Sequence, residues 1–392
     1  MRNTFLNTSL FLIYIVTLLL YWTNLVPDLK DGLAIYVVSS VTLGVMGLAF
    51  YVEAAVERKF SWEDLIILGV FTLILLGHTY YTSTISLQAL NILAVGYLYV
   101  VYPKVSIHTR WVYVAVFWGF ILMSVCYIPE IRESIEKQTD EYAGFLAIFD
   151  SPNSVGTLGL IALASYFLLK EGRDQRPFRW LIAFLLIFLV ILASHQRAAL
   201  LMLLVWMLVY ILIRMGMKRS WIYLSFLAIL AIAGAYVIQT ELSTNEELFG
   251  GYELFGKEAS TRGRSEQISL ALSSYDITAW GEGRGVVNEY IIDDTNYGVH
   301  NAFVITLLEY GYLLFAFYIF FLYWLFRKAK PVAAAFLLGY HVILFVESEN
   351  FFSNHLLTFL AFSVVLIGGN DDEVETDIPE ATDDAQTCTQ EE

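Results

Sequence analysis

The sequence is short of charge and of cysteine for its length. Only 16% of its 392 residues are Asp, Glu, Lys or Arg, against roughly 25% in ordinary soluble domains. This scarcity excludes a disordered chain and a protein that binds nucleic acid through a basic surface. The two cysteines, Cys126 and Cys388, cannot make a disulfide framework, and no Cys or His spacing typical of a metal site occurs.

Apolar sequence is abundant instead. Apolar residues make up 58% of the chain, and the mean hydropathy is +0.62. A soluble protein of this length could not bury so much apolar surface. Runs of about 20 apolar residues recur, which is the length that a helix needs to cross a bilayer. Because lipid offers no partner to the backbone of an open sheet, the sequence predicts an all-α polytopic membrane protein.

The apolar runs predict about twelve transmembrane helices. We place them near residues 5–24, 32–52, 65–83, 84–101, 111–129, 153–169, 180–195, 198–213, 220–239, 301–326, 331–347 and 355–369. The first run lacks a small-residue cleavage site, so we expect an uncleaved span rather than a signal peptide. Residues 1–369 are expected to form one membrane-embedded domain.

Lys and Arg divide unevenly between the two alternating sets of loops. One set holds 15 of the 23, and the other holds eight, four of which lie in a single long loop. By the positive-inside rule the richer set is cytoplasmic. With an even number of spans, both termini are then expected in the cytoplasm.

The end of the sequence has a different composition. Residues 370–392 hold ten of the 38 acidic residues and no Lys or Arg. An acidic segment with few apolar residues cannot bury enough surface to fold alone. We expect a disordered cytoplasmic tail.

Two outer loops are long, near residues 130–152 and 240–300. The second contains RSEQISLALSSY, whose apolar residues among polar neighbours predict an amphipathic helix. The glycine-rich turn GEGRG follows it. Functional residues of membrane proteins gather in such loops or in charged positions at the membrane, so we look for the site on the outer face.

Four arginines are candidates for binding an anion on that face. Arg197 lies in a short connection between two apolar spans, where a charge is costly; the alternative is an arginine that reaches lipid phosphate. Arg262, Arg264 and Arg284 lie in the long loop. A guanidinium binds phosphate through two parallel hydrogen bonds and keeps its charge, although salt bridges to the many loop acids are an alternative role.

His300 is the candidate proton acceptor. It lies where the long loop becomes the span HNAFVITLLEYGYLL, and Asn301 can cap that helix. An imidazole with an ordinary pKa near 6.5 can accept a proton at neutral pH. Glu309 would lie about 13 Å deeper and on the opposite face of a continuous helix, so we expect it to make a structural hydrogen bond. His341 and Glu289 remain alternative bases.

Five segments together resemble the bacterial O-antigen ligase and O-antigen polymerase superfamily of membrane glycosyltransferases. They are FDSPNSVGTLGLIAL, SHQRAALL, TRGRSEQISLAL, WGEGRGVVNEY and HNAFVITLLEYGYLLF, and they cover about residues 140–330. Two departures occur: the usual Ser-Arg pair is split as Ser194-His195-Gln196-Arg197, and the glycine turn reads Gly281-Glu282-Gly283-Arg284-Gly285.

The resemblance implies glycosyl transfer at the outer face of the bacterial inner membrane, with neither a metal nor a nucleotide cofactor. The donor would be a glycan on a polyprenyl diphosphate. The acceptor would be a lipid A-core sugar in a ligase or a growing glycan in a polymerase. His300 would be the base, and Arg197 and Arg264 would hold the diphosphate. Further substrate-binding positions would be Asn153, Arg262, Arg284 and Asn301.

Two other classes of function compete with this interpretation. Twelve spans are common in transporters and lipid flippases, but the halves of the chain show no internal repeat, and few intramembrane acids could relay ions. A scaffold for envelope assembly would leave the outer arginines and His300 without a role.

The loop charges make a testable prediction about topology. A reporter fused after Gly369 should be active in the cytoplasm, and one inserted near Asn245 should be active outside it, because the richer Lys and Arg loops stay inside. Alkaline phosphatase and fluorescent-protein fusions measure the two sides. A cytoplasmic signal at position 245 would overturn the assignment of the site to the outer face.

Overall fold

A computed structural model gives the fold of the chain. It describes residues 2–29, 32–83, 87–136, 147–149, 152–170, 177–194, 196–244, 253–254, 257–258, 264–283, 287, 299–346, 352 and 355–367. The predicted tail 370–392 lies outside the described residues.

The described chain is almost entirely helical. The long helices are α1 (Arg2–Trp22), α2 (Leu33–Val56), α3 (Trp62–Thr82), α4 (Leu87–Val101), α5 (Thr109–Cys126), α7 (Pro152–Lys170), α8 (Pro177–Ala193), α9 (Arg197–Arg214), α10 (Arg219–Thr244), α13 (Ala302–Lys328), α14 (Pro331–Val346) and α15 (Leu356–Ile367). The short elements are η1 (Pro27–Leu29), η2 (Tyr102–Lys104), α6 (Ile128–Glu136), α11 (Arg264–Ser274) and the two-residue strands β1 (Glu253–Leu254) and β2 (Lys257–Glu258).

Each of the twelve predicted spans corresponds to one long helix, so the all-α polytopic prediction is confirmed. Within the described residues, six helices are long and apolar enough to cross a membrane: α1, α2, α3, α5, α9 and α13. Shorter apolar stretches lie in α7, α8, α10, α14 and α15. The number of twelve crossings stays a prediction.

The structure corrects two details of the sequence reading. The loop expected near 130–152 begins with helix α6, whose Ile131 packs against the core while Ile128 is exposed. The span expected to be continuous over 301–326 is broken at Gly311, where φ is 83° and ψ is 168°. Glycine is the residue that reaches such positive φ without strain.

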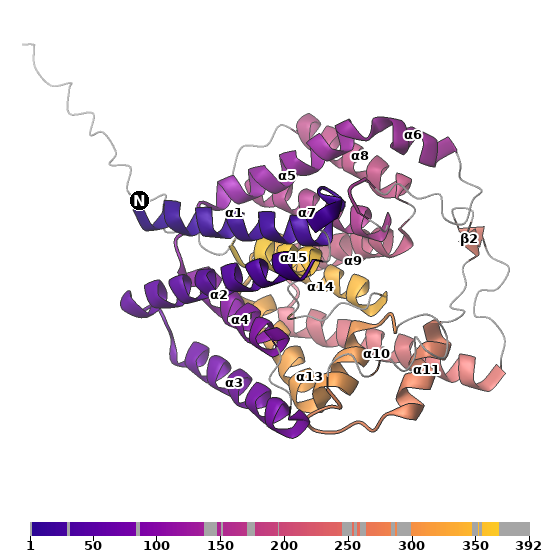
Figure 1. The fold of residues 1–392 in the computed structure, drawn as a ribbon. Helices are drawn as coiled ribbons and strands as arrows, with labels where there is room; N and C mark the ends of the chain where they lie inside the picture. Colours follow the sequence, from indigo (N-terminus) through magenta and orange to yellow (C-terminus); the bar gives the residue numbers. More distant parts are fainter. Residues whose placement is uncertain are drawn as a thin grey trace, which may run out of the picture.

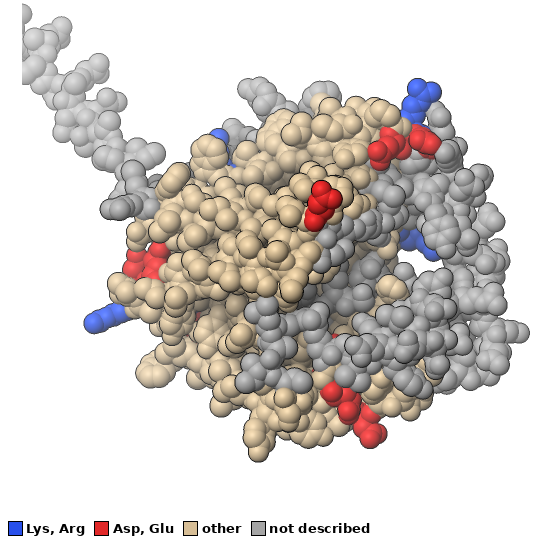
Figure 2. Space-filling model, in the orientation of Figure 1, with Lys and Arg blue, Asp and Glu red and all other residues tan. Residues whose placement is uncertain are grey.

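Three helices fill the centre of the bundle. The described side chains of α14 and α15 are buried almost throughout, and those of α7 nearly so, as expected for helices that are apolar on every side. The other long helices expose one apolar face, as Leu201, Leu204 and Leu208 do on α9. Figure 2 shows that the described part of this face is largely uncharged, with only scattered Lys, Arg, Asp and Glu.

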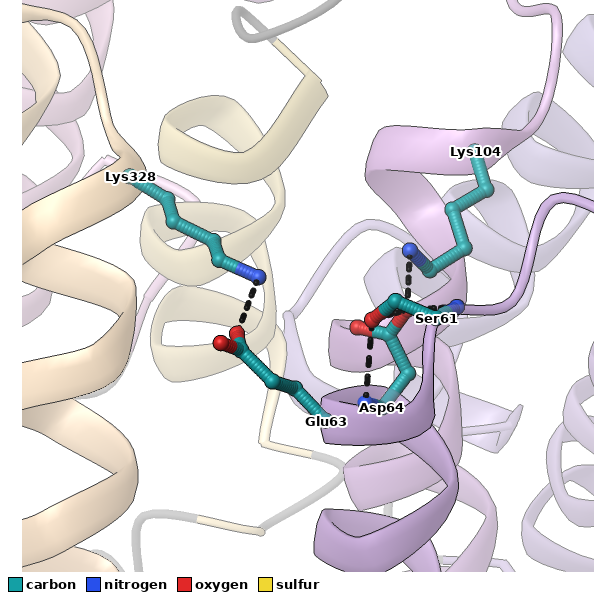
Figure 3. A network of polar contacts seen from close by, with 5 residues as sticks. All are labelled: Ser61, Glu63, Asp64, Lys104 and Lys328. Carbon is teal, nitrogen blue, oxygen red and sulfur yellow. Dashed lines mark hydrogen bonds and ion pairs between the residues drawn. The ribbon is translucent and has the colours of Figure 1, made fainter.

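Polar contacts join helix ends at one end of the bundle, which we name the basic end (Arg58, Lys59, Lys104, Arg219 and Lys328). Figure 3 shows two ion pairs there, Lys104 Nζ to Asp64 Oδ2 at 2.6 Å and Lys328 Nζ to Glu63 Oε2 at 3.4 Å. Arg219 donates to the carbonyls of Phe326, Arg327 and Ala329 at the end of α13.

Asp64 has the most buried charge in this network. Its carboxylate also accepts from the backbone N–H of Ser61 at 2.7 Å and from the hydroxyl of Ser61 at 2.6 Å. Ser61 accepts in return from Asp64 N, which completes a capping box at the start of α3. A buried carboxylate requires such partners because its desolvation is costly.

At the opposite end, which we name the site end, α1 and α3 finish and α7, α9, α13 and α15 begin. Figure 1 shows α1 running from the N-terminus on the left, whereas β2 and α11 lie on the right. Asn24 N donates to Ile148 O at 2.7 Å and ties the chain after α1 to the segment before α7.

The close packing of α3 and α4 gives a stability prediction. A Cβ at Gly96 of α4 would overlap the ring of Phe71, which also stacks on Phe317 with centroids 5.1 Å apart. Because the ring is held on its other side, Gly96→Ala should lower the free energy of unfolding by about 1–3 kcal/mol. The measurement is the thermal unfolding midpoint in detergent.

Gly44→Ala is the matched control, since a Cβ at Gly44 of α2 would meet no atom within 4 Å. Its midpoint should be unchanged or higher, because alanine favours a helix over glycine by about 0.5–1 kcal/mol. Equal midpoints for the two variants would contradict the packing argument.

Candidate functional site

Arg197 is placed by the turn that joins α8 to α9. Gln196 precedes it in an extended conformation and is 2% exposed. The Gln196 amide donates to Thr157 Oγ1 of α7 at 3.2 Å. A Cβ at Gly156 would lie 2.9 Å from Ser194 Oγ, so only glycine lets α7 approach this turn. The start of α7, which carries Asn153, and the turn that carries Arg197 are therefore in contact.

The packing of α9 on α14 determines where Arg197 lies relative to α14. Trp206 Nε1 donates to Val332 O at the start of α14, and Met202 O lies 3.1 Å from the position of a Cβ at Gly339. The two helices are therefore antiparallel, and Arg197 lies beside the last turn of α14. Its side chain is half-buried.

Asn301 holds the start of α13 against the same turn of α14. Its Oδ1 accepts from the N–H groups of Phe303 and Val304, both at 3.0 Å, as a helix cap does. Its Nδ2 donates to Phe345 O at 3.0 Å. The predicted cap is therefore confirmed, and since both ends of this amide are engaged and 2% of the residue is exposed, Asn301 is suited to position its neighbour His300.

His300 and Arg197 thus flank one helix end. His300 directly precedes the cap and is half-buried. Both residues belong to the site end, and each is placed there by contacts of its own element with α14, which follows both in the chain. The structure places these two of the predicted site residues near the same turn of α14.

Helix α11 confirms the amphipathic segment expected in the long loop. Ala271 of α11 and Ile305 and Leu308 of α13 form a second small core with Val287 and Val299. The helix that begins with Arg264 is thereby packed on the first turns of α13, and Figure 1 shows the two helices beside each other. The side chain of Arg264 lies outside the description, as do Arg262 and Arg284 altogether.

Residues 278–283, which we name the 278–283 turn, fill the break in α13. In a continuous helix the N–H groups of Tyr312 and Leu313 would donate to the carbonyls of Leu308 and Glu309. Here Tyr312 N donates to Thr278 O at 3.1 Å and Leu313 N to Ala279 O at 3.3 Å.

The two carbonyls freed by the break are satisfied by the same turn. Leu308 O accepts from Glu282 N at 2.9 Å, and Glu309 O accepts from Gly283 N at 3.0 Å. The turn therefore takes over the four backbone groups of α13 and leaves none of these four without a partner. A Cβ on either Gly281 or Gly311 would overlap the opposite backbone.

The other acidic and histidine candidates have structural surroundings. His341 is 1% exposed, and its two ring nitrogens contact the Tyr318 hydroxyl and Leu337 O, so it has no ring nitrogen left for a base in this structure. Glu309 is buried, as expected of a structural residue. Glu289 lies outside the described residues.

The sequence reading missed the contribution of α3 to this region. His78 Nδ1 lies 2.5 Å from Trp280 O in the 278–283 turn. A histidine within an apolar run gave no signal of such a partner, because the two residues are 202 positions apart.

The comparisons with known proteins point to one family. Residues 182–319 match the model of the O-antigen ligase family. A search of curated proteins finds no match to the chain. The matched segment contains Arg197, Arg264 and His300, and it supports glycosyl transfer in O-antigen biosynthesis as the class of activity. Over residues 182–319 this multi-pass membrane protein therefore matches the O-antigen ligase family, which supports its resemblance to the O-antigen ligase and polymerase superfamily.

Proposed function

We propose that the protein transfers a glycan from a polyprenyl diphosphate to a sugar hydroxyl at the outer face of the bacterial inner membrane. The observation that carries this proposal is the approach of Arg197 and His300 to the last turn of α14, within or beside the O-antigen ligase segment. A ligase with a lipid A-core acceptor is the first candidate, and a polymerase with a growing glycan as acceptor is the second.

The donor requires positive charge at the membrane surface. As the bond between the anomeric carbon and the diphosphate oxygen breaks, its electron pair stays on the diphosphate. Arg197 and Arg264 are the proposed ligands of this anion, with Arg262 or Arg284 as alternatives to Arg264. Each arginine could stabilise the leaving group by up to about 4 kcal/mol at 4 Å and an effective dielectric constant of 20, before desolvation is subtracted.

The acceptor requires a base. A sugar hydroxyl attacks the anomeric carbon from the face opposite the diphosphate, and its proton passes to the His300 imidazole. A single displacement of this kind inverts the anomeric configuration. The diphosphate is already a stable anion, so the step does not depend on a general acid. Asn301 keeps His300 at the start of α13, and Asn153 is proposed to contact substrate from α7.

The base and the anion ligands should differ in their kinetic effects. His300→Ala should lower turnover by about 10²–10⁴-fold and spare donor affinity, because arginines hold the diphosphate. Arg197→Ala and Arg264→Ala should weaken donor binding as well as turnover. Arg197→Lys keeps the charge but loses the planar fork, so its loss should be smaller. The measurement is transfer from a polyprenyl-diphosphate glycan in vitro, with donor affinity determined separately.

Two residues at the basic end serve as matched controls. Arg214→Ala changes the opposite end of α9, and His108→Ala changes an exposed histidine before α5; both should transfer normally. Normal turnover in His300→Ala would refute its role as the base. Normal transfer in all the site variants would refute the proposed site, whereas no transfer by the unaltered protein would favour a transporter instead of an enzyme.

The surface glycan of a deletion strain separates ligase from polymerase. A ligase is the step that joins glycan to lipid A-core, so its loss should remove all core-attached glycan from a gel of cell-surface lipopolysaccharide. Loss of a polymerase should leave core that bears a single repeat unit. An unchanged glycan pattern would contradict both activities.

A further inference from the structure

The 278–283 turn is held against the break in α13 by a third element, helix α3. His78 lies one turn before the end of α3 and is 5% exposed. Its Nδ1 is 2.5 Å from Trp280 O. Because a carbonyl can only accept, Nδ1 carries the hydrogen and donates it. The ring of His78 also packs on Tyr310, with centroids 5.1 Å apart, so one side chain contacts both partners of the pairing.

A glycine makes this contact possible. A Cβ at Gly77 of α3 would overlap the indole ring of Trp280. The ring therefore rests directly on the backbone of α3, and the adjacent residue, His78, binds the carbonyl of the same tryptophan. Gly77 and His78 of α3 thus both contact Trp280 of the turn.

The turn leads directly into a residue of the proposed site. Gly283 makes the last hydrogen bond of the pairing, and Arg284 is the next residue in the sequence. Four backbone hydrogen bonds to α13, together with His78 and Gly77, fix the point from which the chain continues to Arg284. The same helix α13 begins just after His300. The positions of the turn and of the proposed base therefore both depend on α13.

We propose that His78 is a positioning residue for glycosyl transfer, acting through the 278–283 turn on the approach of Arg284 to the donor diphosphate. This rests on the proposed function, in which Arg284 is a candidate diphosphate ligand. His78 itself contacts neither substrate. Its effect is to keep the turn in the break of α13.

Two pairs of variants separate the hydrogen bond from general damage to α3. His78→Phe keeps a ring without the donor, whereas His78→Asn places an amide N–H at the same number of bonds from the backbone as Nδ1. Gly77→Ala pushes against Trp280, whereas Gly69→Ala, on the same helix, meets no atom within 4 Å. His78→Asn and Gly69→Ala should behave like the unaltered protein.

The first measurement needs no substrate. A protease binds the residues before the cleaved bond as an extended strand, so trypsin can cut after Arg284 only when residues 281–283 leave α13. In the purified full chain, cleavage after Arg284 is quantified by mass spectrometry relative to cleavage after Lys257, which lies in β2 and outside the contact between the 278–283 turn and α13. His78→Phe and Gly77→Ala should raise this ratio about fivefold to tenfold, as expected when a buried hydrogen bond or contact no longer opposes local opening.

The second measurement is transfer in vitro with the donor and the acceptor varied separately. His78→Phe should raise the KM for the donor about fivefold to tenfold, in proportion to the opening of the turn, and leave the KM for the acceptor unchanged. His78→Asn should restore the donor KM. A merely structural defect would lower the amount of active enzyme and change neither KM.

The outcomes separate this proposal from the proposed function. An unchanged cleavage ratio in His78→Phe would show that His78 does not hold the turn and would overturn the proposal. A raised ratio with an unchanged donor KM would equally overturn its role in transfer. If the unaltered protein transfers no glycan, the proposed function fails, and the role of His78 in transfer fails with it, while the cleavage ratio still decides whether His78 holds the turn.

Discussion

The site end of the bundle depends on one constraint, that every buried backbone N–H and C=O must find a partner. Helix α13 gives up two of its own hydrogen bonds at Gly311, and the 278–283 turn supplies four replacements. A chain that kinked there without the turn would bury unsatisfied groups, each at a cost of about 1–3 kcal/mol. The turn and the break therefore require each other. The 278–283 turn, which belongs to the long loop, is held on the bundle by its hydrogen bonds to α13.

The break also explains how α13 can serve two environments. Beyond Gly311 the helix continues to Lys328 through buried aromatic residues such as Phe317 and Phe321, as a membrane helix does. Before Gly311 its first turns pack on α11 in a small separate core and carry Asn301 and His300. A residue in left-handed conformation lets one segment be both a span and part of the loop platform.

The sequence predicts the helices well because each apolar run is a local signal. All twelve expected runs are helices, with ends shifted by a few residues, and α5 ends at Cys126 before the amphipathic helix α6. A turn at GEGRG is also predicted, because its glycines are a local signal, and the structure describes Gly281–Gly283 of it. Its insertion into α13 is not predicted, because a glycine in an apolar run reads as a tolerated helix residue. The partners of Gly311 lie about 30 positions away, and His78 lies 202 positions from Trp280; no periodicity encodes such pairs.

The candidate site residues also divide into features that local sequence indicates and contacts that depend on the fold. The positions of Arg197 and His300 beside apolar runs make them candidates, and the resemblance implies their roles. The cap role of Asn301 follows from its place before an apolar run. Their approach to one turn of α14 could not be read, because it depends on how α9 and α14 pack. The matched segment 182–319 moreover contacts helices that lie outside it. It contains both the 278–283 turn and the break at Gly311. Helix α3, which contacts Trp280, precedes the segment in the sequence, and α14, which contacts α9 and Asn301, follows it. We therefore propose that the O-antigen ligase segment belongs to one membrane domain with α3 and α14, in line with the expectation for residues 1–369.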